Sequence, residues 1–245
     1  MKITFLGTGK FSSATRRCSA TLLNDQILVD IGYGAITGLW EKNLNTENIN
    51  TLILTHFHDD HIGDLWWMLS RRGAREEVHP LTIIAPTGFG KYVLGYYRTC
   101  IGPAETLQDM AFYNNMKGIK IIEMTEFDSC NVGGVRVSSF PAVHSKKHHC
   151  LGYVLDIYGD KIGFSGDTYC NRVLEEQIPS APVWVINCPI EKNDSDRHMG
   201  LIDVQRIATP NMNKKFYITH RGEYHAPTNP NIFLPNDGDE VEVNN

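Results

Sequence analysis

The chain contains 245 residues with a formal net charge of −5, and hydrophobic residues make up 42% of it. This composition supplies enough apolar material for a sizeable core and excludes a disordered chain. The acidic balance argues against a broad nucleic-acid surface, which needs clustered Lys and Arg, but it allows a small anionic substrate. The length and the even composition predict a single domain over 1–245.

Short β-rich segments bounded by turn residues recur along the chain. The predicted strands are 3–7, 20–23, 27–31, 51–55, 81–85, 119–123, 135–140, 152–157, 161–165, 183–187, 216–219 and a closing strand at 240–243. The predicted helices are 35–42, 63–72, 89–97 and 202–208. Many strands with few helices between them predict two packed sheets with helices outside, rather than a simple βαβ repeat. The aromatic-rich region 89–115 is compatible with a lid, a dimer surface or ordinary helix packing.

The cysteines and the N-terminal segment bear on the cellular compartment. The six cysteines are dispersed and form no C-x-x-C pair, and the apolar stretch at 3–6 is too short for a signal peptide. No apolar run approaches the roughly 20 residues of a membrane-spanning helix. We therefore expect free thiols, no membrane contact and a cytoplasmic location.

One segment concentrates the chemistry. The predicted strand 51–55 ends in three His and two Asp within the six residues 56–61. A solvated polar turn explains this density poorly, and imidazole with carboxylate suits a divalent ion such as Zn²⁺. In extended backbone His56 and His58 point to one side, whereas Asp60 and His61 fall on the following turn and can serve a second ion.

The pattern His56-x-His58-x-Asp60-His61 behind an apolar strand resembles the signature of the metallo-β-lactamase superfamily. Other segments resemble further elements of that superfamily in the same order: LVDIG at 28–32 lies upstream, and PAVH at 141–144, FSGDT at 164–168 and ITH at 218–220 lie downstream. The resemblance implies an α/β (α+β) fold in four layers, an αββα sandwich of two mixed sheets flanked by helices.

The resemblance also implies two metal sites that share a carboxylate. The first ion would be held by His56, His58 and His144, the second by Asp60, His61 and His220, and Asp167 would bridge them. Two divalent ions, with Zn²⁺ the leading choice and Mn²⁺ or Fe²⁺ as alternatives, would hold a bridging hydroxide. His198 resembles a histidine that assists proton transfer to the leaving group. The candidate catalytic residues are therefore His198 and the metal-site residue Asp60.

Substrate contacts are predicted from two places. The opening FLGTG at 5–9, followed by Arg17, resembles the start of the ribonuclease Z group and makes Gly7, Thr8 and Arg17 candidate substrate-binding residues. Ser145 and Lys146 adjoin the third histidine of the first site and are candidates for phosphate binding. A tight turn at 7–9 and a solvated loop at 145–149 are the alternatives.

Two departures from the ribonuclease Z group point to a smaller substrate. His144 and Asp167 lie 23 positions apart, room for two short strands and a turn, where that group carries an arm that grips tRNA. Cys188 stands where that group has the Glu that orients its proton-donating His. The short spacing and Asn187-Cys188 resemble the cyclic phosphodiesterases more closely.

The sequence therefore predicts a dinuclear metal-dependent hydrolase that cleaves a small cyclic or nucleotide-like phosphodiester. The alternatives are a ribonuclease Z-like endonuclease that processes RNA 3′ ends, a thioesterase of the glyoxalase II type, and a non-catalytic metal-dependent nucleotide binder. The expected partner is a small phosphodiester and not an extended nucleic acid, and the resemblance is compatible with a homodimer.

Overall fold

Two seven-stranded mixed sheets form the centre of the structure, a computed structural model that describes residues 1–73, 79–100, 118–147, 149–191, 197–222 and 227–243. The first sheet has the order β14-β1-β2-β3-β4-β5-β6. Its strands are β1 Lys2–Gly7, β2 Ala20–Leu23, β3 Ile27–Val29, β4 Thr51–Ile53, β5 Leu81–Pro86, β6 Ile119–Met124 and β14 Glu240–Glu242. The strands from β3 to β6 run parallel, and β1 pairs antiparallel with both β2 and β14.

The second sheet has the order β13-β12-β11-β10-β9-β8-β7. Its strands are β7 Ser129–Val132, β8 Val135–Pro141, β9 Leu151–Ile157, β10 Asp160–Phe164, β11 Val183–Asn187, β12 Lys215–Thr219 and β13 Ile232–Phe233. The strands from β7 to β10 form antiparallel pairs, and those from β10 to β13 are parallel.

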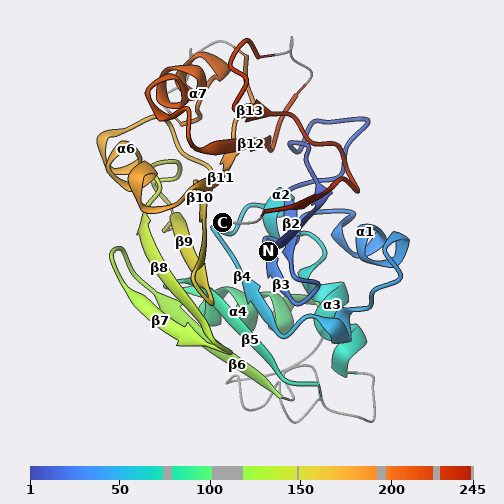
Figure 1. Ribbon diagram of the computed structural model, residues 1–245. Coiled ribbons are helices and arrows are strands. Elements are labelled where there is room, and N and C mark those ends of the chain that lie inside the picture. The colour runs from blue at the N-terminus through green and yellow to red at the C-terminus, as the bar shows by residue number, and fades with distance from the viewer. Residues whose placement is uncertain (74–78, 101–117, 148, 192–196, 223–226, 244–245) are drawn as a thin grey trace.

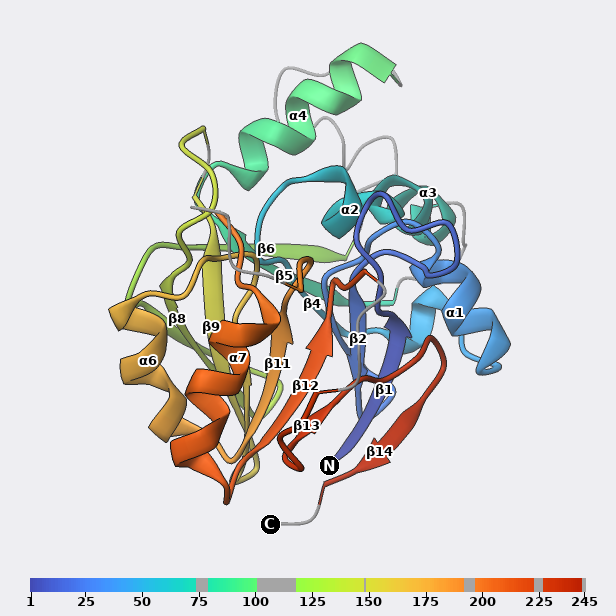
Figure 2. The same cartoon turned by 90° about the horizontal axis from the view of Figure 1, so that it is seen from above.

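Helices lie on the outer faces of both sheets, as the two ribbon views show (Figures 1 and 2). The helices are α1 Ala35–Glu41, α2 Asp59–Ile62, α3 Leu65–Gly73, α4 Phe89–Cys100, α6 Arg172–Gln177 and α7 Leu201–Ala208, with single 3₁₀ turns at η1 Thr46–Asn48, η2 Ile178–Ser180 and η3 Thr209–Asn211. Helices α1 and α3 cover the first sheet, and α6 and α7 cover the second. The predicted αββα sandwich is confirmed.

Alternating side chains of the strands build three separate cores. On β4, Leu52 faces the helices of the first sheet while Ile53 faces the other sheet. On β11, Val185 faces the first sheet while Trp184 packs against α6 and α7. Because successive residues of a strand point to opposite faces, a strand buried on both faces appears as a continuous apolar run. This burial holds the strand ends, and hence the site, in fixed positions.

The predicted strands agree with the observed ones to within a few residues, but the two-residue strand β13 and the helix α6 were not predicted. Strand β7 was not predicted either. Its side chains are exposed or half-buried, so it lacks an apolar pattern. Gly133 and Gly134, both with positive φ, form a two-residue turn that pairs β7 with β8. Of the region 89–115, the structure describes α4, and residues 101–115 lie outside the described residues.

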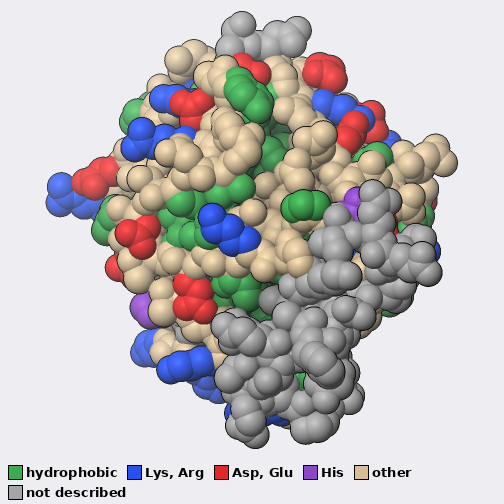
Figure 3. All heavy atoms as spheres, turned by 90° about the horizontal axis from the view of Figure 1, so that it is seen from below, with side chains coloured by type: hydrophobic (Ala, Val, Ile, Leu, Met, Phe, Trp, Pro, Cys, Tyr) green, Lys and Arg blue, Asp and Glu red, His purple; other side chains and the backbone are tan. Residues whose placement is uncertain are grey.

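The surface and the thiols agree with parts of the composition analysis. Figure 3 shows one face of the molecule, on which Lys and Arg side chains lie near Asp and Glu side chains at the upper edges, hydrophobic and uncharged groups fill much of the middle, and several Lys and Arg side chains lie together at the lower left. The cysteines at 18, 130, 150, 170 and 188 are free. Among the described residues, no helix has the length and apolar character needed to cross a membrane.

Candidate metal centre

Four strand ends deliver the polar side chains to one place. His56 follows β4, His144 follows β8, Asp167 follows β10 and His220 follows β12. The one-turn helix α2 begins directly after His58. The last residues of β4, β10 and β12 are buried, so the segments that follow these strands are anchored on one side and carry their polar groups at the edge of the two sheets.

The first predicted trio converges on a single point. His56 Nε2 and His144 Nε2 each lie 3.0 Å from His58 Nδ1. Each imidazole has a second nitrogen whose partner can fix its tautomer: His56 Nδ1 lies 3.1 Å from the Thr55 hydroxyl, and His144 Nδ1 lies 3.2 Å from the Arg197 carbonyl oxygen. A proton on Nδ1 of His56 and of His144 leaves the lone pairs of their Nε2 atoms directed into the cluster, as ligation of a cation requires, and His58 faces the cluster with Nδ1.

The second predicted trio lies next to the first. His220 Nε2 is 2.8 Å from Asp60 Oδ2, and Asp60, His61 and His220 together form a group with metal-binding spacing. His61 Nδ1 lies 2.7 Å from Asp30 Oδ2, so a proton shared there leaves His61 Nε2 as the free ligand atom. The carboxylate that fixes His61 was not among the predicted site residues.

Asp167 stands between the two trios. Its Oδ1 lies 3.4 Å from His61 Nε2 and 3.5 Å from His220 Nδ1, and its Oδ2 lies 3.6 Å from His144 Nε2 and 3.9 Å from His56 Nε2. The Asn187 side-chain amide donates to Asp167 Oδ1 at 2.9 Å, and the Thr219 hydroxyl donates to the Asn187 side-chain oxygen at 2.9 Å. This chain of bonds fixes the carboxylate that faces both trios.

Burial and charge set the protonation of these groups in opposite directions. Burial lowers the pKa of His56 well below its usual value and lowers the pKa of His144 to about 4, which favours neutral imidazoles. Burial alone would raise the pKa of Asp60, but the hydrogen bond from His220 brings it to about 2.

For the remaining two groups, the neighbouring charges outweigh burial. Burial opposes a charge on Asp167, but the surrounding histidines, His220 foremost, hold its pKa well below its usual value. Burial also disfavours charged His61, yet the carboxylates of Asp167 and Asp30 hold the pKa of His61 well above its usual value. The pocket therefore combines neutral imidazoles with carboxylates that attract positive charge.

The donor set fits divalent metal ions. Among the described residues, the buried nitrogens His61 Nε2, His198 Nδ1 and His220 Nδ1 have no hydrogen-bond partner. Buried polar atoms are almost always paired, so three unpaired nitrogens around one carboxylate fit the ligand set of a cation. Imidazole and carboxylate ligands at this spacing suit Zn²⁺ and related ions.

His198 joins the same cluster. Its Nδ1 lies 3.7 Å from Asp167 Oδ2, and its ring centroid lies 4.6 Å from that of His144. Burial lowers the pKa of His198, and Asp167 opposes that effect. The Cys188 thiol, at the position of the orienting Glu of the ribonuclease Z group, donates to the Ile190 carbonyl oxygen at 3.4 Å. The role of His198 as an acid stays a prediction.

The residues predicted to bind substrate near the N-terminus have structural contacts. A Cβ on Gly7 would lie 1.8 Å from the Cys18 carbonyl oxygen. Thr8 is buried, and both its backbone N–H and its hydroxyl donate to Asp237. Arg17 Nε donates to the Leu6 carbonyl oxygen at 2.7 Å. These contacts support a structural role, and substrate binding by Gly7, Thr8 and Arg17 stays a prediction.

The other two predicted substrate-binding residues lie at the rim. Ser145 and Lys146 follow His144; Ser145 is half-buried and Lys146 is exposed. The Ser145 hydroxyl accepts from the Lys147 backbone N–H at 3.1 Å. Their contact with a phosphate stays a prediction. The described part of the segment between His144 and Asp167 contains the β9–β10 hairpin, as the 23-position spacing predicted.

Three residues that support the cluster were not predicted as site residues. Asp30, Thr55 and Asn187 each hold a member of the cluster, and each lies at the end of a buried strand or just beyond it. A polar residue at the end of an apolar run was the available signal for all three. Asp30 also has φ of 57°, a conformation that needs a reason in a residue other than glycine.

Comparison with known proteins identifies the family. The model of the family described as "Anti-Pycsar protein Apyc1" matches residues 1–232. The chain belongs to this family. The fold of this Apyc1-family chain is that of the metallo-β-lactamase fold protein YhfI from Bacillus subtilis (TM-score 0.75, 17% identity, 98% of this chain and 99% of the other).

Two further similarities concern ribonuclease Z. The Apyc1-family chain is 32% identical to a ribonuclease Z of Agathobacter rectalis over 187 residues, which are 76% of this chain and 52% of that protein. It thus spans about half the length of that relative. Its fold also resembles that of the short form of human tRNase Z, with a TM-score of 0.75, 20% identity and full coverage of both chains.

Proposed function

We propose that this chain is a dinuclear metal-dependent hydrolase that cleaves a small cyclic or nucleotide-like phosphodiester. The observation that carries the proposal is the pair of neighbouring trios, His56–His58–His144 and Asp60–His61–His220, with Asp167 between them. Zn²⁺ is the proposed ion, with Mn²⁺ and Fe²⁺ as alternatives. The relative named ribonuclease Z supports a phosphodiester as the scissile group.

The bound ions, the residues that hold the ligands and His198 each have a separate role in the proposed reaction. Two bound ions would supply charge neutralisation for the phosphoryl oxygens and an activated water. Asp30, Thr55 and Asn187 keep the ligand atoms aimed inward, so that little reorganisation is needed when substrate binds. His198 donates a proton to the leaving oxygen, and its position beside Asp167 supports this role.

Three observations favour a small substrate over a long RNA. The β9–β10 hairpin fills the segment where the ribonuclease Z group carries its tRNA-gripping arm. The net charge is −5, and acidic and basic side chains are mixed on the face shown in Figure 3. RNA binding relies on positive charge over an extended surface, and a chain of net charge −5 has more acidic than basic side chains.

The proposal is tested by removing single ligands. We expect His58→Ala and Asp167→Ala to abolish hydrolysis of 2′,3′-cyclic, 3′,5′-cyclic and 1,2-cyclic phosphoribosyl diesters with Zn²⁺ or Mn²⁺, while circular dichroism reports a folded chain. His79→Ala, a histidine outside the cluster, is the matched control and should keep full activity. Turnover retained by either ligand variant would refute the assignment of the site.

A ribonuclease Z-like nuclease is the second candidate, favoured by the 32% identity to the Agathobacter rectalis protein. Cleavage of a 3′-extended tRNA precursor faster than of the small cyclic diesters would establish it. Stoichiometric nucleotide binding without hydrolysis would instead establish a non-catalytic metal-dependent nucleotide binder. The proposal includes a homodimer in the cytoplasm, and light scattering of the purified chain tests the dimer.

A further inference from the structure

A small buried cavity lies between the two sheets, next to the residues that support the metal centre. Its room for the centre of a water-sized sphere is about 10 Å³, which is close to what one water molecule needs. Every residue that lines it is buried, and Val29 and Val185 belong to the core between the sheets. The polar residues that line it are Ser19, Thr21, Asp30, Thr55, Asn187 and Thr219.

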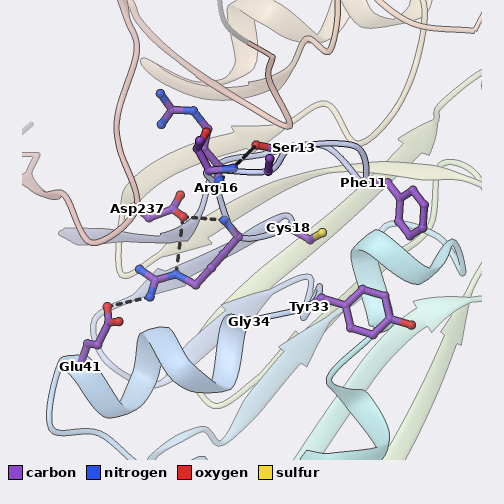
Figure 4. A pocket seen from close by; sticks show the side chains of 11 residues that line it. Phe11, Ser13, Arg16, Cys18, Tyr33, Gly34, Glu41 and Asp237 are labelled. Carbon is purple, nitrogen blue, oxygen red and sulfur yellow. Dashed lines mark hydrogen bonds and ion pairs between the residues drawn. The ribbon is translucent and has the colours of Figure 1, made fainter.

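Ser19 and the residue before it line different spaces. Cys18 lines an open pocket together with Tyr33 and Asp237 (Figure 4), whereas Ser19 lines the buried cavity. Ser19 is 4% exposed, and its hydroxyl has no hydrogen-bond partner among the residues that the structure describes. Because buried hydroxyl groups are almost always bonded, this one requires a partner, and the cavity beside it is the place where a partner can lie.

Two supports of the metal centre have hydrogen-bonding capacity left at the same cavity. Asn187 donates one amide N–H to Asp167, and its second N–H has no partner among the described residues. Asp30 Oδ1 accepts from the Thr55 backbone N–H at 2.8 Å. The Thr55 hydroxyl has a single hydrogen and lies closer to Asp30 Oδ2, at 2.9 Å, so Oδ1 can accept from another donor. The cavity therefore combines a donor, an acceptor and a hydroxyl that can act as either.

These groups suit one water molecule better than an ion or an organic ligand. A space of about 10 Å³ is too small for a larger molecule. The amide N–H of Asn187 would repel a cation and the carboxylate of Asp30 would repel an anion, whereas water can both donate and accept. A buried water makes about three hydrogen bonds, and Ser19, Asp30 and Asn187 each offer one.

We propose that this cavity holds one structural water that bonds to Ser19, Asp30 and Asn187. Asp30 holds His61 of the second trio, and it follows β3 of the first sheet. Asn187 holds Asp167, the carboxylate between the trios, and it ends β11 of the second sheet. The water would thus connect the two supports across the sheets, and Ser19 is a positioning residue that acts through it. Only the effect on metal binding rests on the proposed function.

A crystal structure of the wild-type chain tests the water directly. We expect one ordered water within about 3.2 Å of Ser19 Oγ, Asp30 Oδ1 and the Asn187 amide nitrogen. Electron density without a water at this place, or a water that contacts only one of the three atoms, would overturn the proposal.

Thermal unfolding distinguishes a bonded hydroxyl from an unbonded one by the sign of the change. Ser19→Ala should lower the melting temperature by about 2–4 °C, the effect of one lost hydrogen bond in a chain of this length. Thr4 is the matched control, because its buried hydroxyl also has no partner among the described residues, and Thr4 does not line the cavity. Thr4→Val should leave the melting temperature unchanged or raise it. An unchanged or raised melting temperature in Ser19→Ala would overturn the proposed bond to water.

Titration of the metal-free chain with Zn²⁺ measures the positioning role. Ser19→Ala should weaken Zn²⁺ binding by about 3- to 10-fold, less than the loss of a direct support of a ligand, while Thr4→Val stays within about twofold of the wild type. Equal Zn²⁺ affinity in Ser19→Ala and the wild type would overturn the positioning role. If the wild type binds no metal, the proposed function fails by itself, and the crystal structure and the melting temperatures still decide the water site.

Discussion

The contact between Asp30 and His61 gives the sharpest prediction about the metal centre. Asp30 is 4% exposed, and its carboxylate accepts from the Thr55 backbone N–H at 2.8 Å and the Thr55 hydroxyl at 2.9 Å while facing His61 Nδ1 at 2.7 Å. In Asp30→Asn, the amide oxygen can keep the Thr55 backbone bond, which turns the amide N–H₂ toward His61. Asn tolerates the φ of 57° at this position, so the backbone should stay as it is.

The expected loss follows from the role of the carboxylate. A donor facing His61 Nδ1 favours the tautomer with its proton on Nε2, which removes the ligand lone pair from the second trio. Loss of such a supporting partner costs about 10- to 100-fold in metal affinity, or about 1.4–2.7 kcal/mol. Titration of the metal-free chain with Zn²⁺ against a competing chelator should therefore show one of two binding events weakened by that factor.

A matched variant makes this prediction specific. Asp64 is another largely buried carboxylate, but it accepts from the Gly34 and Ile36 backbone N–H groups at 3.0 Å each and contacts no predicted ligand. Asp64→Asn should leave both binding events unchanged. Two binding events within twofold of the wild type in Asp30→Asn would refute the reasoning.

Three further predictions concern stability. Removal of metal by a chelator should lower the free energy of unfolding by about 2.7 kcal/mol relative to protein held at 100 times the Kd, and a melting curve unmoved by the chelator would contradict this. Asp237→Asn should cost about 1.5–3 kcal/mol in urea unfolding, because charge-assisted bonds from Thr8 and Arg17 are weakened, and a loss below 0.5 kcal/mol would contradict it. Gly7→Ala should cost about 1–3 kcal/mol, since the new Cβ would lie 1.8 Å from the Cys18 carbonyl oxygen, and unchanged stability with a raised KM would instead favour substrate binding at Gly7.

The sequence predicted the parts of the fold that depend on apolar burial. Strands such as β4 and β11 are buried on both faces, so their apolar runs stand out between turn residues. Strand β7 is exposed and lacks that signal, and its pairing depends on the turn at Gly133 and Gly134. The one-turn helix α2 is too short to show a helical period.

The predicted metal ligands come together because each follows a strand end, but their supports depend on tertiary contacts. Asp30 lies 31 positions before His61, and Asn187 lies 20 positions after Asp167. Thr8 bonds to Asp237, which is 229 positions away. Such pairs have no local sequence pattern, so these supporting contacts could not be predicted from the sequence alone.

The central claim is that water attacks the phosphorus of a small diester at this centre. Hydrolysis of a cyclic nucleotide by the Zn²⁺- or Mn²⁺-loaded chain in ¹⁸O-enriched water tests it directly, with the product analysed by ³¹P NMR and mass spectrometry. We expect one ¹⁸O atom in the phosphomonoester product of the wild type and no product from Asp167→Ala. Label in the sugar hydroxyl, or unlabelled product, would contradict it.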